Sequence, residues 1–259
     1  MADSTVPGRF VWFDLMTTDP DAAVAFYTRV VGWGTTTFES EKGPYTMWTA
    51  NETPIGGVMR LPPEATAAGA GPYWLGYIST PDANATTARA RELGARVWVG
   101  PADIPNVGRF SIMTDPQGAH FAAFQPTGVA PAAAAEPKPG EVSWDELATT
   151  DHEAAFRFYS ELFGWQETEA MDMGPMGIYQ MFGLDGQTMG AMYDKPAEMP
   201  GPPVWTFYVG VPDIEAAARA TTEAGGQIIN GPMEVPGGDM IIMGVDPQGV
   251  PFAAHQRKR

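Results

Sequence analysis

The sequence predicts an α+β protein of two tandem domains, each built from two βαβββ units, here called modules. Three observations lead to this prediction: the length, an internal repeat, and a strand-and-helix pattern that recurs within each half. The chain has 259 residues, which suits about two compact domains. Each half is long enough to bury a hydrophobic core of its own.

The repeat is visible directly in the sequence. The segment WFDLMTTD that starts at Trp12 matches WDELATTD starting at Trp144, which lies 132 positions later. A late DPQG segment that starts at Asp115 returns at Asp246, which lies 131 positions later. Matches in one register at both ends of a half indicate duplication. We predict domains at residues 8–126 and 140–257, joined by a Pro/Ala-rich linker at 127–139.

Strand and helix signals follow a fixed order within each half. Apolar alternation over residues 10–16 predicts a strand, and Thr18-Asp19 supplies a side-chain oxygen that can cap a helix. Apolar residues at helical spacing continue to Gly32, which suits the left-handed turn after a helix. The pattern restarts near residue 73, so the chain holds four modules. The other strands predicted in the first domain are 35–38, 45–49, 55–60, 73–79, 96–99, 109–113 and 120–124, with a second helix from Asp82 to about Leu93; the second domain repeats this plan from Val142 to His255.

The chain is acidic and lacks cysteine. Its net charge is −16, with 31 acidic and 15 basic residues, and such a surface repels nucleic-acid backbones. The lack of Cys excludes disulfides, thiolate metal sites and cysteine nucleophiles. Residues 1–9 have no apolar core for a signal peptide, and no apolar run is long enough to span a membrane. We expect a cytoplasmic protein, as a monomer or homodimer.

Both halves carry the same series of motifs. Asp19, Phe26-Tyr27 and Gly32-Trp33 precede DPQG in the first half, and Asp151, Phe158-Tyr159 and Gly164-Trp165 precede it in the second. In this order and twice over, they resemble the vicinal oxygen chelate superfamily of glyoxalases, bleomycin-resistance proteins and extradiol dioxygenases, and within it the two-domain bacterial glyoxalase-like group. The resemblance implies that two modules curl into an open half-barrel cleft for a small organic ligand. It also implies that the Phe-Tyr pairs are structural, because the helices pack on the outer sheet face.

Metal-dependent members of that superfamily hold a divalent ion with His, Gln or Glu on the first strand and Glu on the last strand of each module. None of the corresponding positions here offers an imidazole or a carboxylate. We therefore expect that the metal site is lost and that no cofactor is bound. The first-strand positions are Trp12, Leu75, Trp144 and Thr206, and the last-strand positions are Gly57, Ala122, Gly190 and Ala253.

Two acids are the candidate catalytic residues. Alternation places Asp14 on the same strand face as Trp12, and Glu146 on the same face as Trp144. By the resemblance, this face lines the cleft. A carboxylate beside an indole is expected to have a raised pKa, because desolvation disfavours its charged form, and it then suits general acid–base catalysis. The alternative is structural: each acid accepts hydrogen bonds from the backbone of a neighbouring loop.

Aromatic and histidine side chains are the candidates for ligand contact. Rings in a cleft stack on flat ligands, whereas rings in a core serve packing alone, and the sequence leaves both possibilities open. The two histidines considered lie on last strands, on the side of the sheet that carries Ala122 and Ala253. Together with Trp12 and Trp144, the candidates are Tyr45, Trp48, Tyr77, His120, Tyr179, Tyr208 and His255.

Three functions remain open. The first is a metal-free protein that binds a small, partly aromatic molecule, as the likeness to bleomycin-resistance proteins implies. The second is an enzyme, namely a lyase, isomerase, hydrolase or dioxygenase that uses Asp14 and Glu146 or a metal bound elsewhere. The third is an interaction module whose cleft is vestigial. Ligand binding without turnover would indicate the binding protein, and turnover, with or without a metal, would indicate the enzyme. A filled cleft would indicate the interaction module.

Overall fold

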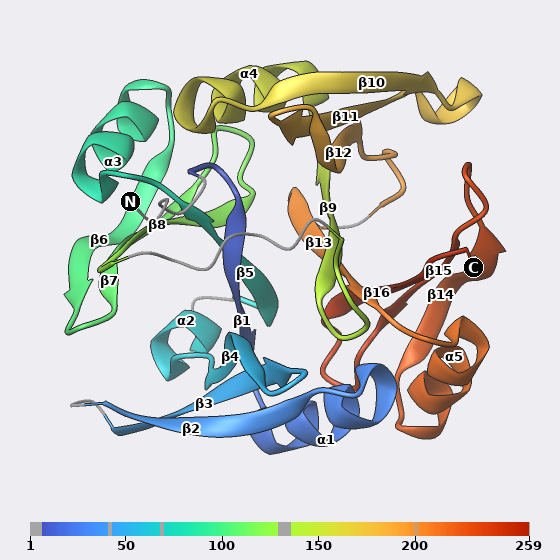
Figure 1. Cartoon of the computed structure of the whole chain (residues 1–259). Helices are drawn as coiled ribbons and strands as arrows, with labels where there is room; N and C mark the ends of the chain where they lie inside the picture. Colours follow the sequence, from blue (N-terminus) through green and yellow to red (C-terminus); the bar gives the residue numbers. More distant parts are fainter. Residues whose placement is uncertain (1–6, 41–42, 68–69, 129–135, 200, 259) are drawn as a thin grey trace. The chain divides into compact units, whose positions relative to one another are not determined.

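The first sheet contains both modules of the first half. In this computed structural model the described residues are 7–40, 43–67, 70–128, 136–199 and 201–258. The strands are β1 (Phe10–Thr17), β2 (Gly34–Ser40), β3 (Gly43–Ala50), β4 (Thr53–Arg60), β5 (Tyr73–Ser79), β6 (Arg96–Ile104), β7 (Gly108–Thr114) and β8 (His120–Pro126), and the helices are α1 (Pro20–Val31), α2 (Pro63–Ala67) and α3 (Ala83–Glu92). They form one sheet in the order β2-β3-β4-β1-β5-β8-β7-β6 (Figure 1).

The second sheet repeats this topology. Its strands are β9 (Val142–Thr149), β10 (Gln166–Asp172), β11 (Ile178–Leu184), β12 (Gln187–Asp194), β13 (Val204–Gly210), β14 (Gln227–Glu234), β15 (Met240–Val245) and β16 (Pro251–Gln256), with helices α4 (His152–Phe163) and α5 (Ile214–Glu223) and the short 3₁₀ turn η1 (Gly174–Met176). The order is β10-β11-β12-β9-β13-β16-β15-β14. The α+β class and the four βαβββ modules are therefore confirmed.

Two short helical segments were not predicted. The five-residue helix α2 has no buried residue, and η1 is a single turn, so neither presents the apolar spacing that identifies a helix in a sequence. Strand β6 also extends beyond the predicted residues 96–99 to Ile104. Most of the predicted linker, residues 129–135, lies outside the described residues, as do residues 1–6 of the segment searched for a signal peptide. The linker assignment and the domain limits stay predictions.

The four long helices begin at an aspartate in the same way. Asp19, Asp82, Asp151 and Asp213 are each in an extended conformation, and each side chain accepts a hydrogen bond from a backbone N–H of the first helical turn. These bonds satisfy donors that a helix cannot satisfy internally. The repeated Asp therefore sets the start of each helix.

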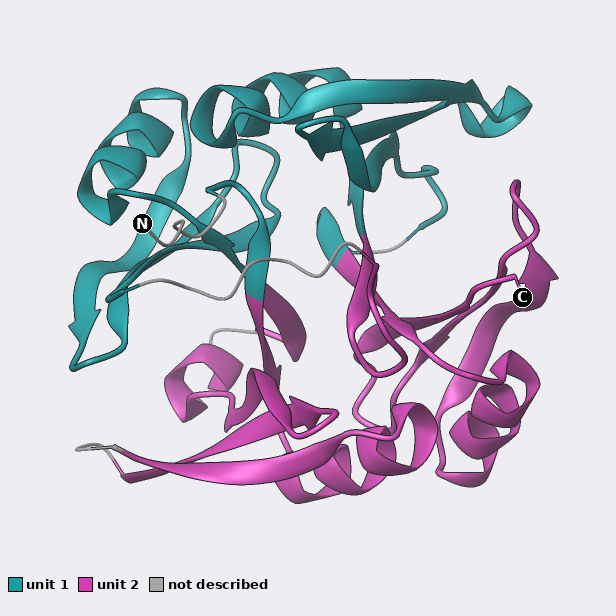
Figure 2. Cartoon of the chain, viewed as in Figure 1, with its two compact units in different colours: residues 1–11, 76–135, 145–205 teal, residues 12–75, 136–144, 206–259 magenta. Residues whose placement is uncertain are grey.

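The chain folds into two compact units, shown in different colours in Figure 2. Unit 1 comprises residues 1–11, 76–135 and 145–205, and unit 2 comprises residues 12–75, 136–144 and 206–259. By these ranges, unit 1 contains most of the second and third modules, and unit 2 contains most of the first and fourth. Each unit thus combines one module from each half of the repeat.

The repeated Tyr and DPQG motifs meet within each unit. In unit 2 the Tyr27 hydroxyl on α1 donates to Oδ2 of Asp246 at 3.2 Å. In unit 1 the Tyr159 hydroxyl on α4 donates to Oδ2 of Asp115 at 3.1 Å. All four side chains are buried. The predicted structural role of the Phe-Tyr pairs is therefore seen directly, since each joins a helix to the turn of another module.

None of the helices among the described residues is long and apolar enough to cross a bilayer.

Candidate functional site

In unit 2, the acid predicted as catalytic is bound to a tyrosine. The Tyr45 hydroxyl donates to Oδ1 of Asp14 at 2.5 Å, and the Trp12 indole N–H lies 2.9 Å from the same oxygen. The indole N–H is also 3.0 Å from the Tyr45 hydroxyl oxygen. Asp14 is only 4% exposed, whereas Trp12 and Tyr45 are half-buried. Three of the predicted residues therefore form one polar cluster on one strand face.

Gly57 allows this cluster to form. It lies on β4, opposite Asp14 of β1 on one side and opposite Met47 of β3 on the other. To reach Asp14, the Tyr45 side chain crosses β4 directly over Gly57. A Cβ on Gly57 would lie 1.9 Å from the Tyr45 hydroxyl oxygen, which is far inside contact distance. The glycine leaves the space that the tyrosine fills.

Unit 1 contains an equivalent pair. The Tyr179 hydroxyl on β11 donates to Oε2 of Glu146 on β9 at 2.6 Å. Ala191 of β12 lies opposite Glu146, where the first module has Gly57 opposite Asp14. The ring of Tyr193 stands 6.0 Å from that of Tyr179. The sequence placed Gly190 at the equivalent of Gly57, but Gly190 pairs with Asp145, so the match shifts by one residue to Ala191.

Three tyrosines near the two acids have raised pKa values and stay protonated near neutral pH. Burial, followed by the charge of Asp14, raises the pKa of Tyr45 far above its ordinary value. Burial and the same charge also raise the pKa of Tyr73, which the sequence did not single out. In unit 1, burial and the charge of Glu146 raise the pKa of Tyr193. Each acid is thus faced by phenols that cannot ionise near neutral pH, and the arrangement suits binding or proton transfer with a ligand oxygen.

The donor set at these positions does not suit a divalent metal. Tyr45 fills the space over Gly57 that a ligating side chain would need. Across the described residues, the structure brings no three His, Asp or Glu side chains together in a group that could hold an ion. One carboxylate bonded to a phenol falls short of the three or four donors that such ions take from a protein.

One predicted ligand contact is corrected. Trp48 lies on β3 three residues after Tyr45, so strand alternation turns it to the opposite face. It is fully buried, with its ring 5.8 Å from Tyr27 and 5.3 Å from Trp33. Trp48 is therefore a packing residue in the core of unit 2.

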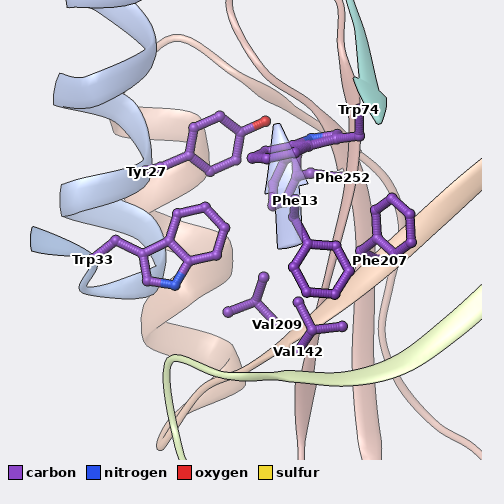
Figure 3. Close-up of a pocket in the computed structure, with 8 residues that line it drawn as sticks. All are labelled: Phe13, Tyr27, Trp33, Trp74, Val142, Phe207, Val209 and Phe252. Atoms are coloured by element: carbon purple, nitrogen blue, oxygen red, sulfur yellow. The ribbon is translucent and has the colours of Figure 1, made fainter. Parts of the chain in front are cut away.

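The same core contains a small apolar void (Figure 3). Phe13, Tyr27 and Trp33 are among the side chains that surround it, and its free volume is about 10 Å³. That is no more than the room that a single water molecule needs. This void is a packing defect and cannot hold an organic ligand.

Three further predicted aromatic residues lie on β5, β13 and β9. Tyr77 is buried against Phe110 and Phe124 of unit 1. Tyr208 is buried in unit 2, and Trp144 is half-buried at the start of β9.

The two predicted histidines have different surroundings. The His120 ring stacks on exposed Trp98, and burial lowers the pKa of His120. His255 of unit 2 is bonded to Asp239 and Ser143. Sequence reasoning missed Trp98, Asp239 and Ser143, because their partners lie on strands whose pairing no local pattern reveals.

The sequence matches one protein family model in both halves and resembles several bacterial proteins along nearly its whole length. The family model of the Glyoxalase/Bleomycin resistance protein/Dioxygenase superfamily matches residues 9–122 and 141–253. CFP32 of Mycobacterium tuberculosis, whose name describes it as a glyoxylase, is 32% identical over 245 residues, covering 93% of this chain and 92% of that protein. The anthracycline biosynthesis protein DnrV of Streptomyces peucetius is 30% identical over 259 residues, covering 95% and 92%.

Solved structures share the fold. The 2,3-dioxygenase LapB from Pseudomonas sp. KL28 has a TM-score of 0.67 at 12% identity, covering 98% of this chain and 94% of that one. The Mn(II)-bound glyoxalase from Novosphingobium aromaticivorans has a TM-score of 0.63 at 18% identity, covering 98% and 82%. These identities support the fold alone. With a family model that matches both halves, the chain belongs to the Glyoxalase/Bleomycin resistance protein/Dioxygenase superfamily.

Proposed function

We propose that this protein binds a small, flat molecule that carries hydroxyl or carbonyl oxygens, and that it does so without a divalent metal. The observation behind this proposal is the placement of Tyr45 over Gly57, with its hydroxyl on Asp14. A phenol and a carboxylate stand beside Trp12 and Gly57, the positions at which the resemblance to metal-dependent members implies metal ligands. Such a pair can exchange hydrogen bonds with ligand oxygens, and the adjacent indole of Trp12 offers a stacking surface.

The ligand class is drawn from the relatives. Two curated relatives are named anthracycline biosynthesis proteins, DauV and DnrV. Anthracyclines are polycyclic aromatic molecules with phenol and quinone oxygens. A face with an indole, phenols and a carboxylate complements such a molecule, because rings stack on rings and the polar groups hold the oxygens.

Binding of alizarin, a dihydroxyanthraquinone, tests the proposal by calorimetry. We expect Asp14→Asn and Glu146→Gln each to weaken binding at one site by about 10-fold, since a hydrogen bond to a charged group is lost. Asp103→Asn is the matched control: it also removes one negative charge, but from an exposed ion pair with Arg109, and should leave the affinity unchanged.

The metal is tested on the same samples. We expect elemental analysis to find far less than one equivalent of transition metal, and a chelator to leave alizarin affinity unchanged. A stoichiometric metal whose removal abolishes binding would contradict the proposal. The proposal would also be contradicted if Asp14→Asn and Glu146→Gln both bound alizarin with the affinity of the wild type.

One observation favours an enzymatic alternative. The 2.5 Å bond between Tyr45 and Asp14 holds a proton between two oxygens, and a proton held in this way suits acid–base catalysis on a ligand bound beside it. An isomerase or lyase would convert its ligand, and Asp14→Asn would abolish conversion while binding persisted. Binding without conversion across a metabolite panel would exclude this alternative in favour of a binding protein.

A further inference from the structure

Unit 2 contains a polar chain that the proposed function does not use. The Ser143 hydroxyl of β9 lies 2.9 Å from Nδ1 of His255 on β16. Nε2 of His255 lies 2.8 Å from Oδ2 of Asp239, just before β15. The His255 side chain is 12% exposed and that of Asp239 is 33% exposed. The order serine–imidazole–carboxylate is the one used by proton-relay sites.

The fold does not require this hydrogen-bonded series of Ser143, His255 and Asp239. In the register of the repeat, the first half has Val11, Phe124 and Gly108 where the second half has Ser143, His255 and Asp239. The Phe124 ring there fills the space beside Gly108, since a Cβ on that glycine would lie 2.6 Å from the ring. The same strands are thus built with apolar packing in one half and a hydrogen-bonded chain in the other.

Asp239 fixes the proton on the far side of the imidazole. Burial acts to raise the pKa of Asp239, but the bonds from the Lys258 backbone N–H and from His255, with the nearby charges of His255 and Arg257, outweigh it and hold that pKa below its ordinary value. An ionised carboxylate can only accept hydrogen bonds. Nε2 of His255 therefore carries its hydrogen, and Nδ1 faces Ser143.

The Ser143 hydroxyl can satisfy either protonation state of His255. Its oxygen also lies 3.1 Å from the carbonyl oxygen of Tyr208. When His255 is neutral, the hydroxyl donates to Nδ1. When His255 is charged, Nδ1–H donates to the serine oxygen and the hydroxyl turns to the Tyr208 carbonyl. A single hydroxyl rotation therefore accommodates proton gain or loss without leaving a buried polar group unpaired.

We propose that Ser143, His255 and Asp239 form an acid–base site, in which His255 exchanges a proton through Ser143 with an oxygen of a bound phenol or enolisable ketone. As the ligand hydroxyl loses its proton to the serine oxygen, the serine hydrogen passes to Nδ1. The products are a ligand oxyanion and an imidazolium held by Asp239, and the reverse step returns the proton. This inference rests on the proposed function, because the same ligand class supplies the oxygen.

Calorimetry of alizarin binding in two buffers of different ionisation enthalpy measures the linked protons. At a pH at which free alizarin is already an oxyanion, we expect wild-type binding to take up about one proton from the buffer, because the complex holds the ligand oxyanion together with the imidazolium of His255. Ser143→Ala and His255→Gln should each reduce this number toward zero while the affinity stays within about 3-fold. Val11→Ala is the matched control, because it truncates the counterpart of Ser143 in the first half, and should leave the proton number unchanged.

The outcomes separate this inference from the proposed function. Binding with no linked proton, or an unchanged proton number in Ser143→Ala, overturns the acid–base site and leaves the binding function standing. If alizarin does not bind, the binding function fails, and the relay is judged in the free protein by ¹⁵N NMR of the imidazoles. There, the neutral His255 should carry its hydrogen on Nε2, and a hydrogen on Nδ1 would overturn the relay.

Discussion

At the scale of the residue, the chain places a buried acid where its own repeat uses a phenyl ring. Asp145 of β9 occupies the position that Phe13 holds in the first half, and it is only 8% exposed. Burial raises the pKa of Asp145 to about 8, although the charge of Arg9 opposes that change. Oδ1 of Asp145 has no hydrogen-bond partner among the described residues. This acid therefore costs folding free energy when it is charged.

The protein should lose stability as pH rises through the range in which Asp145 is protonated in the folded state but ionised in the unfolded state. The unfolded chain releases this proton near pH 4, whereas the folded chain holds it up to about pH 8. Within this window the unfolded state binds fewer protons, so the free energy of unfolding falls with increasing pH. Asp145→Asn should remove this pH dependence, and so reduce the total fall in the free energy of unfolding between about pH 4 and pH 8 by a few kcal/mol. Urea unfolding at several pH values measures it, and an unchanged slope would show that Asp145 ionises freely in the fold.

At the scale of the element, the length of the acid matches the residue on the neighbouring strand. Asp14 lies beside Gly57, and the longer Glu146 lies beside Ala191. A tyrosine that crosses a glycine can lie close to the sheet and meet a short acid. A tyrosine that crosses an alanine is lifted by the methyl group, and the extra methylene of glutamate restores its reach.

This match predicts a rescue. Gly57→Ala should displace Tyr45, break its bond to Asp14 and lower the free energy of unfolding by about 1–3 kcal/mol. Adding Asp14→Glu should recover a substantial part of that loss, because it recreates the Glu146 arrangement. Urea unfolding of the two single variants and the double variant gives the coupling free energy. A coupling of zero would mean that the two positions are independent.

At the scale of the whole molecule, two buried Tyr–Asp bonds join modules from different halves of the repeat. Tyr27 and Asp246 are joined in unit 2, and Tyr159 and Asp115 in unit 1. Burial, then the Asp246 charge, raises the pKa of Tyr27 well above its ordinary value, so it stays a donor. The aspartates also accept backbone N–H bonds of their own DPQG turns.

Removing either hydroxyl should weaken the unit that contains it. We expect Tyr27→Phe and Tyr159→Phe each to lower the free energy of unfolding by about 1–3 kcal/mol, because a buried carboxylate oxygen loses its donor. Chemical denaturation with hydrogen exchange on the helices measures the loss and locates it. Equal exchange in the variants and the wild type would show that these bonds do not hold the modules together.

The sequence by itself determined the duplication, the four modules, the helix starts and the family. These features follow from local spacing, such as apolar alternation, Asp caps and the repeated DPQG turn, which one stretch of chain displays in full. It also selected Asp14, Tyr45, Glu146 and Tyr179 as candidate residues, but it did not pair them.

Only the tertiary structure decided which modules share a compact unit, which tyrosine meets which acid, and that Trp48 belongs to the core. It also brought together Ser143 and His255, which are 112 residues apart. The physical reason is that strand partners and buried hydrogen bonds are chosen by long-range packing, and a residue leaves no trace of its distant partner in its own neighbourhood of the sequence.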